Sequence, residues 1–159
     1  MPYPATERLS TNRSAEPANE QRGVIFHDSG LSFEETIARA VKPGAAVSYH
    51  CVIAPDGSQC TLVPDAQVAR HAGVSTFLGR SGCDAFTLGV AFAGDTNASP
   101  LSSHQLASAV EWLARRWKAR GWTPESVTDH RQASGGREKD LNPVEWARLK
   151  AALSARFAP

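Results

Sequence analysis

The chain alternates between short apolar runs bounded by turn residues and longer segments with a helical repeat of apolar positions. Residues 23–26 (GVIF) and 86–94 (FTLGVAFAG) are apolar runs that predict buried strands. Residues 46–64 hold two β-rich runs on either side of Asp56-Gly57, a dipeptide that favours a tight turn, so they predict a hairpin. A further short strand is predicted at residues 126–130 (SVTDH).

Three segments predict helices. Residues 31–41 begin with a capping box of Ser32 and Glu35. Residues 102–121 end at Gly121, and the last helix begins with Asn142 as N-cap and Pro143 at the first helical position. Each helix has one apolar stripe for packing. The three stripes are Phe33, Ile37, Ala40 and Val41; Leu106, Val110, Leu113 and Trp117; and Trp146, Leu149, Leu153 and Phe157.

The predicted order of elements is β-α-β-β-β-α-β-α. This order favours one α/β domain of the α+β kind, in which helices flank a single mixed β-sheet. A chain of 159 residues is long enough to bury a substantial core. Residues 1–21 are polar and contain Pro2, Pro4 and Pro17, so we expect an N-terminal arm that is poorly ordered or draped over the surface. The domain itself is expected to span residues 22–159.

Composition argues against several kinds of partner. The net charge of +1 gives no electrostatic footprint for nucleic acid. No apolar run approaches the roughly 20 residues needed to cross a bilayer, and residues 1–21 lack the apolar core of a secretory signal peptide. The odd number of cysteines, without a C-x-x-C pair, favours free thiols in a reducing compartment. Cys51 and Cys60 are expected on one face of the hairpin, diagonal to each other, and we predict no disulfide between them.

His27 and His130 each end a predicted strand and precede polar, flexible sequence. Strand ends that lead into loops are where rigid scaffolds often carry functional sites. Asp140 lies ten residues after His130, across a loop that contains Gly135 and Gly136. Two imidazoles, one carboxylate and an open fourth position would make a catalytic zinc site. From spacing alone, a structural interpretation stays open: the histidines cap strands, and Asp140 binds backbone near a helix start.

The remaining histidines have simpler interpretations. His104 lies in the first turn of the long predicted helix, where a solvated side chain is expected. His50 follows Tyr49 along the hairpin, so their side chains are expected on opposite sides of the sheet. His71 lies near a bend at Gly73, and a half-buried structural role is open for both His50 and His71. The sequence contains no G-x-S-x-G, P-loop, G-x-G-x-x-G or H-E-x-x-H motif.

Four stretches, taken in order, carry a resemblance to a known family. They are VIFHDSG, VSYHCVIAPDGSQCTLVPDAQVARHAGVS, FLGRSGCDAFTLGVAFAG and VTDHRQASGGREKD. They resemble the zinc-dependent N-acetylmuramoyl-L-alanine amidases, which include the anhydro-muropeptide amidases, phage lysozymes and peptidoglycan recognition proteins. The resemblance covers residues 22 to 157, and the order of the four motifs is more specific than any one of them.

The resemblance implies a mixed sheet flanked by helices, with Zn2+ held in a groove by His27, His130 and Asp140. It implies hydrolysis of the amide between the lactyl group of N-acetylmuramic acid and L-alanine of the peptidoglycan stem peptide. The substrate would be peptidoglycan or a muropeptide, with zinc polarising the carbonyl and activating water. His50 and His71 are expected to line the groove as substrate-binding residues. Arg80 is expected either to bind a substrate carboxylate or to be a solvated surface residue.

The chain departs from the anhydro-muropeptide branch at the acid–base positions. Ala91 stands where that branch carries a catalytic Glu, Glu138 stands where it carries a Lys, and Leu141 replaces a common Pro. In the phage-lysozyme branch a Tyr at the position of Tyr49 serves catalysis. The expected catalytic residues are therefore Tyr49 together with either Glu138 or Lys139.

Two other functions stay open. The change at Ala91 is compatible with a non-catalytic module that binds peptidoglycan or muropeptides and retains the groove and the zinc. A zinc hydrolase that cleaves a different amide is the third hypothesis. The N-terminal sequence suits a cytoplasmic recycling enzyme, and equally a phage endolysin or an effector that reaches the wall without a signal peptide. We expect a monomer.

Overall fold

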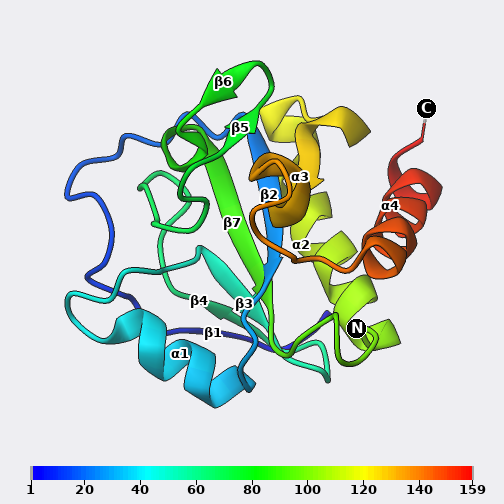
Figure 1. Ribbon diagram of the computed structural model, residues 1–159, viewed down its shortest axis with the longest axis horizontal. Coiled ribbons are helices and arrows are strands. Elements are labelled where there is room, and N and C mark those ends of the chain that lie inside the picture. Colours follow the sequence, from blue (N-terminus) through cyan, green and yellow to red (C-terminus); the bar gives the residue numbers. More distant parts are fainter. Residues whose placement is uncertain (1, 159) are drawn as a thin grey trace.

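The computed structural model describes residues 2–158 and contains a six-stranded sheet with helices on both faces (Figure 1). The strand order is β1-β4-β3-β7-β2-β8, and only the β3–β4 pair is antiparallel. β5 (Thr76–Phe77) and β6 (Arg80–Ser81) form a separate two-stranded hairpin. This mixed sheet confirms the predicted fold class. The six strands are β1 (Ala5–Glu7), β2 (Gly23–Asp28), β3 (Cys51–Ile53), β4 (Gln59–Thr61), β7 (Thr87–Phe92) and β8 (Val127–Asp129).

The three predicted helices are present, with a further short helix before the last one. They are α1 (Phe33–Val41), α2 (Ser103–Arg120), α3 (His130–Ala133) and α4 (Pro143–Phe157), with 3-10 turns at Cys83–Ala85 and Pro124–Ser126. Ser32 accepts a hydrogen bond from the backbone N–H of Glu35, as expected of an N-cap. Gly121 ends α2 in the left-handed conformation, and Asn142 caps α4. No helix among residues 2–158 is long and apolar enough to cross a membrane.

One face of the sheet carries the main hydrophobic core. Helices α2 and α4 pack against this face, and Figure 1 shows both on the same side of the sheet. Neighbouring residues of a strand point to opposite faces, so alternate apolar positions of β2 and β7 are buried here. These residues are Val24, Phe26, Leu88, Val90 and Phe92.

The opposite face carries the intervening side chains, which apart from Ile25 are polar or small. They include His27 on β2 and Thr87, Gly89 and Ala91 on β7. Helix α1 covers one part of this face with Ile37 and Ala40, and the ring of His71 lies over Gly89. The alternation therefore separates an apolar core face from a face on which polar groups can gather.

The N-terminal residues, expected as an arm that is poorly ordered or draped over the surface, lie along the domain and add an edge strand to its sheet. β1 pairs with β4 in parallel, with Ala5 opposite Gln59. The buried side chains of Ser10 and Asn12 both donate hydrogen bonds to the carbonyl oxygen of Ala40, near the end of α1. The structure thus forms a strand where the sequence predicted no regular element.

The predicted arrangement of Cys51 and Cys60 was wrong. The register pairs Cys51 with Thr61 and Val52 with Cys60, so the two thiols lie on opposite faces of the hairpin. Cys51 packs in the main core, and Cys60 packs in the cluster beneath α1. The prediction of free thiols is confirmed for both.

Candidate metal centre

His27 and His130 lie side by side at the carboxyl ends of neighbouring parallel strands. β2 pairs with β8 so that Phe26 lies opposite Asp129, and a histidine follows each of these residues. The two imidazole centroids are 4.5 Å apart. The predicted strand is one residue too long, because Asp129 accepts a hydrogen bond from the N–H of Gln132 and makes His130 the first residue of α3.

Asp140 completes a group of three potential metal ligands. Its Oδ1 lies 3.1 Å from Nδ1 of His130, and its Oδ2 lies 3.8 Å from Nδ1 of His27. One ligand atom from each residue lies within 4.8 Å of the others, and no second group of this kind occurs among residues 2–158. Donors bound tetrahedrally at 2.0–2.1 Å from one ion are roughly 3.3 Å apart. The three side chains therefore fit a small metal ion with little movement.

Asp129 holds the loop that returns Asp140 to the histidines. Its carboxylate is fully buried and bonds both ends of the loop, accepting from the N–H of Gln132 at 3.0 Å and from the N–H of Leu141 at 3.2 Å. Between these ends, the glycine pair at 135 and 136 adopts φ angles of 66° and 86°, which glycine tolerates best. The loop that contains Gly135 and Gly136 thus returns Asp140 to the side of His130.

Each histidine of the group turns Nδ1 toward Asp140 and Nε2 away from it. Nε2 of His130 lies 3.2 Å from the carbonyl oxygen of Ala72, which can only accept, so this nitrogen donates. Burial opposes the charged form of His130, but the hydrogen bond and charge of Asp140 outweigh burial and raise its pKa. Burial, reinforced by His71 and His130, lowers the pKa of His27 well below its ordinary value. His27 is therefore neutral, as a metal-binding imidazole must be.

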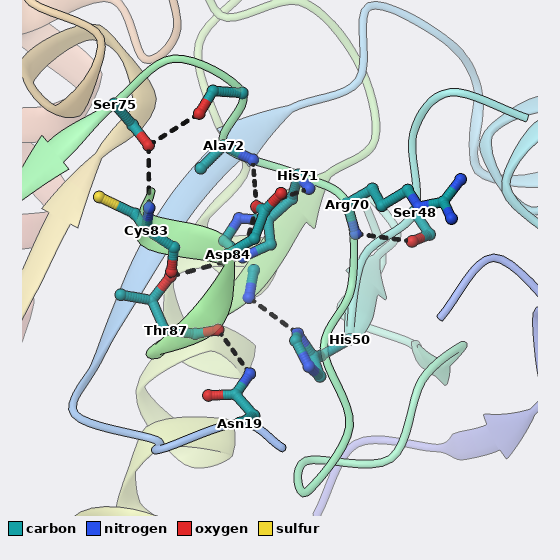
Figure 2. A network of polar contacts seen from close by, with 12 residues as sticks. Asn19, Ser48, His50, Arg70, His71, Ala72, Ser75, Cys83, Asp84 and Thr87 are labelled. Atoms are coloured by element: carbon teal, nitrogen blue, oxygen red, sulfur yellow. Dashed lines mark hydrogen bonds and ion pairs between the residues drawn. The ribbon is translucent and has the colours of Figure 1, made fainter. Parts of the chain in front are cut away.

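His71 lies directly behind His27, on the side away from Asp140. Its Nδ1 is 2.9 Å from Nε2 of His27, and its ring packs over Gly89. Figure 2 shows Asp84 next to His71: one carboxylate oxygen accepts from the backbone N–H groups of His71 and Ala72 at 3.0 and 2.8 Å. Burial lowers the pKa of His71 to about 3, so it is neutral near pH 7.

His50 lies deeper than His71 and is bonded on both ring nitrogens. Its Nδ1 accepts from the N–H of Gly89 at 3.0 Å, the dashed line that reaches His50 in Figure 2. Its Nε2 donates to the carbonyl oxygen of Gln67 at 2.8 Å. Burial, and next the charge of His71, lower its pKa to about 4. His71 lines the adjacent cavity, whereas His50 is not part of its wall. The structure thus places one of the two predicted groove histidines at the surface of the groove and encloses the other.

A cavity of about 530 Å³ opens beside His130. Its wall contains groups of both charges, and the apolar part of the wall comes from residues such as Val47 and Val74. A neighbouring recess of about 340 Å³ is lined by Asp28, Lys139 and Asp140, and Glu138 lines both spaces. The charged residues of the larger cavity are Arg70, Asp84, Arg137 and Glu138.

The three predicted catalytic residues differ in their burial and position around the ligand group. Tyr49 is buried with its ring 5.4 Å from that of His27, and burial followed by the charge of Asp140 raises its pKa to about 12. Its phenol is therefore a proton-bearing donor at neutral pH. Glu138 is exposed on the wall of the cavity. Lys139 lines the smaller recess, where its Nζ donates to the carbonyl oxygen of Gly136 at 3.0 Å.

Arg80, predicted to bind substrate, is engaged elsewhere. Its guanidinium makes two hydrogen bonds of 2.9 Å to the carboxylate of Glu20 and lies 4.4 Å from the centroid of the Phe86 ring. It does not contribute to the wall of the 530 Å³ cavity. Ala91 lies opposite His27 in the β2–β7 register and is fully buried, so no carboxylate is present at that position.

The sequence profile of the family described as N-acetylmuramoyl-L-alanine amidase matches residues 17–143. The chain belongs to this family. It is 35% identical over 111 residues to the 1,6-anhydro-N-acetylmuramyl-L-alanine amidase AmpD of Citrobacter freundii, an alignment that covers 68% of this chain and 58% of AmpD. With AmpD of Escherichia coli the identity is 33% over 111 residues, covering 68% of this chain and 59% of AmpD. The chain thus spans less than two thirds of the length of these relatives.

Solved structures share its fold. A crystal structure of a selenomethionine derivative of AmpD superposes with a TM-score of 0.77 at 22% identity and covers 94% of both chains. AmiD of E. coli, in complex with anhydro-N-acetylmuramic acid-L-Ala-D-γ-Glu-L-Lys, has a TM-score of 0.73 at 20% identity and covers 91% of this chain and 62% of AmiD. The amidase fold predicted from the four motifs is confirmed.

Sequence reasoning missed Asp129, Asp84 and Thr87 around the site. Asp129 could have been found from local chemistry, because an Asp three residues before Gln132 is a helix N-cap pattern. Asp84 and Thr87 reach His71 only through the fold, and their sequence carries no comparable signal.

Proposed function

We propose that this family member is a zinc-dependent N-acetylmuramoyl-L-alanine amidase. It would hydrolyse the amide between the lactyl group of N-acetylmuramic acid and L-alanine of the stem peptide. The observation that carries the proposal is the convergence of His27, His130 and Asp140 at the edge of a cavity with charged walls. Membership of the amidase family supports the proposed reaction at this site.

Zinc is the metal that suits this donor set best. Two imidazole nitrogens and one carboxylate are the ligand types of catalytic zinc sites, which keep a fourth position open for water or substrate. Bound there, zinc would supply Lewis acidity toward the scissile carbonyl and toward water. Both Nδ1 atoms face Asp140, so the donors point to one place.

Three residues around the ligands would take the other catalytic roles. Tyr49 keeps its proton at neutral pH, so its hydroxyl would donate a hydrogen bond to the oxyanion that develops on the carbonyl. Glu138, on the wall beside His130, would act as the general base that accepts the proton from water. Lys139 would add positive charge next to Asp140.

The proposed substrate is a soluble muropeptide rather than intact wall. Stem peptides carry free carboxylates, and Arg70 and Arg137 place two guanidinium groups in the cavity wall. The relatives named as 1,6-anhydro-N-acetylmuramyl-L-alanine amidases and the AmiD complex with an anhydro-muropeptide support this substrate class. The chain would work as a monomer.

One experiment tests the proposal directly. Zinc-loaded and metal-stripped protein would be incubated with sacculi and with soluble anhydro-muropeptides, and the products identified by mass spectrometry. We expect free stem peptide from the muropeptides in the zinc-loaded sample only. Equal release by stripped protein would refute the zinc requirement, and preferential release from sacculi would refute the substrate assignment.

A second candidate function rests on Ala91. Because Ala91 is fully buried opposite His27, the carboxylate expected from the anhydro-muropeptide branch is missing from that strand. The chain would then be a muropeptide-binding module that retains the metal. Absence of product from both substrates, together with zinc-dependent retention of muropeptide in equilibrium dialysis, would favour this function over the amidase.

A further inference from the structure

We propose that Thr87 and His71 form a hydrogen-bonded chain that fixes the tautomer of His27 and leaves its Nδ1 bare for the metal. The proposal rests on the metal site of the proposed function and assigns positioning roles to two residues that bind neither metal nor substrate in it. It follows from the direction of three consecutive hydrogen bonds.

Thr87 sets the direction in which the hydrogen bonds of this series are donated. Its hydroxyl donates to the carbonyl oxygen of Cys83 at 2.7 Å, a contact drawn in Figure 2. A hydroxyl has one hydrogen, so toward Nε2 of His71, 3.4 Å away, the Thr87 oxygen accepts. The carboxylate of Asp84 lies 3.6 Å from the same nitrogen and also favours a hydrogen there. Nε2 of His71 therefore carries the ring hydrogen.

The protonation of His71 on Nε2 then determines which nitrogen donates in its hydrogen bond with His27. The His71 side chain is buried, with the His27 and His50 rings centred 5.1 and 6.0 Å away, which favours the neutral ring with its one N–H on Nε2. Its Nδ1 has only a lone pair and accepts from Nε2 of His27 across 2.9 Å. The His27 side chain is buried as well, so the neutral ring is favoured, and with its hydrogen on Nε2 its Nδ1 is bare. This Nδ1 is the atom that faces Oδ2 of Asp140.

The position of the His71 ring is fixed as closely as its tautomer. A Cβ atom on Gly89 would lie 2.4 Å from Cγ of His71, so the imidazole occupies the space that any larger residue would fill. Asp84 holds the backbone of this segment through the N–H groups of His71 and Ala72. Thr87 and Gly89 are two residues apart in β7, so they lie on the same face of the strand. Together they position the His71 ring above this face.

A hydrogen bond to the second nitrogen of a metal-binding histidine selects its tautomer and orientation, and losing such a partner typically weakens metal binding about 10- to 100-fold. Most such partners are carbonyl or carboxylate oxygens. Here the partner of His27 is a second neutral imidazole, whose own tautomer must be set, and Thr87 sets it.

The test combines tautomer spectroscopy with zinc affinity. Two-bond 1H–15N correlation spectra of the metal-free protein should show His27 and His71 both protonated on Nε2. Thr87→Val keeps the side-chain shape and removes the hydroxyl, so it should populate the other tautomer of His71 and raise the zinc Kd, measured by chelator competition, about 10-fold or more. Thr87→Ser should restore both. Thr128→Val removes another buried threonine hydroxyl in the same sheet and should change neither.

An Nδ1-protonated His27 or His71 in the metal-free parent protein would overturn the proposal without any variant. Unchanged tautomers and an unchanged zinc Kd in Thr87→Val would overturn it as well. Failure of the proposed function has a different signature: the parent protein releases no stem peptide, while the tautomers and the zinc Kd still respond to Thr87.

Discussion

The buried carboxylate of Asp129 accepts a hydrogen bond from the backbone N–H of Leu141, and so fixes the residue before Leu141 beside the two histidines. The same carboxylate caps α3 through the N–H of Gln132. One side chain thus closes the loop that separates two proposed metal ligands, His130 and Asp140. The metal site depends on this closure, because neither ligand alone determines where the loop returns.

Asp129→Asn should weaken zinc binding without removing a ligand. The Asn oxygen can still cap Gln132, but its amide hydrogens would face the N–H of Leu141, so two donors would meet. We expect the zinc Kd to rise about 10- to 100-fold and the metal-free protein to lose about 1–3 kcal/mol of unfolding free energy. Chelator competition and urea unfolding measure the two effects. An unchanged Kd would show that the loop closes without Asp129.

His130→Ala should abolish zinc binding and amidase activity together, because it removes a ligand from a three-ligand site. The matched control is His104→Ala. His104 is exposed and is the one histidine of the five that lies away from the site, so this variant should keep metal content and rate. Metal content by atomic absorption and turnover of anhydro-muropeptide are the measurements. Full activity in a metal-free His130→Ala sample would rule out the proposed centre.

Tyr49→Phe should lower kcat about 100- to 1,000-fold, the usual loss for one oxyanion donor, with little change in zinc affinity. The ring stays buried in the cluster beneath α1, so the fold should tolerate the change. The chain has two tyrosines, and Tyr3→Phe is the control, since the Tyr3 hydroxyl contacts the distant His104. Steady-state kinetics on anhydro-muropeptide give kcat and KM separately. A rise in KM alone would assign Tyr49 to binding.

Glu138→Gln should lower kcat about 100-fold or more if Glu138 is the general base. The side chain is exposed, so the substitution should leave the fold and the zinc Kd unchanged. Glu34→Gln, an exposed change on α1, is the control. An unchanged rate in Glu138→Gln would remove Glu138 from the mechanism and leave Lys139 as the remaining loop residue with a proposed role.

The sequence predicted the parts of this fold that local patterns determine. β2 and β7 were predicted correctly because they are apolar runs. α2 was predicted correctly because it has a helical repeat of apolar residues and ends at Gly121. β1 is exposed along its length and has no apolar signal, so it was missed. Its place in the sheet depends on backbone pairing with β4, and no side-chain pattern in the sequence indicates this pairing.

The candidate site was predictable in a similarly uneven way. His27, His130 and Asp140 were identified because strand ends and a Gly-Gly loop suggested them and a family resemblance selected them. Arg80 was assigned to the groove, but its partner Glu20 lies sixty residues away in sequence, and only the fold brings them together. The contact between Thr87 and His71 likewise needs the register of β7 and the space above Gly89.

Acid should destabilise the metal-free protein through His50. Its ring is buried and bonded as the neutral form, donating to Gln67 and accepting from the N–H of Gly89, and its pKa is about 4 in the fold. In the unfolded chain the pKa is about 6.5, so between pH 6.5 and 4 the unfolded state binds a proton that the fold excludes. The contribution of His50 to stability is therefore complete above pH 6.5 and falls by about 1.4 kcal/mol per pH unit on acidification.

His50→Gln removes this titrating group, so it should lose about 2 kcal/mol less unfolding free energy than the parent protein between pH 7 and pH 5. Urea unfolding of both metal-free proteins at the two pH values measures the difference, which is insensitive to a constant loss of stability in the variant. His104→Gln, at an exposed position, should follow the parent protein. An equal loss in His50→Gln and the parent protein would mean that His50 takes up its proton without unfolding, and that its bonds to Gln67 and Gly89 yield to protonation.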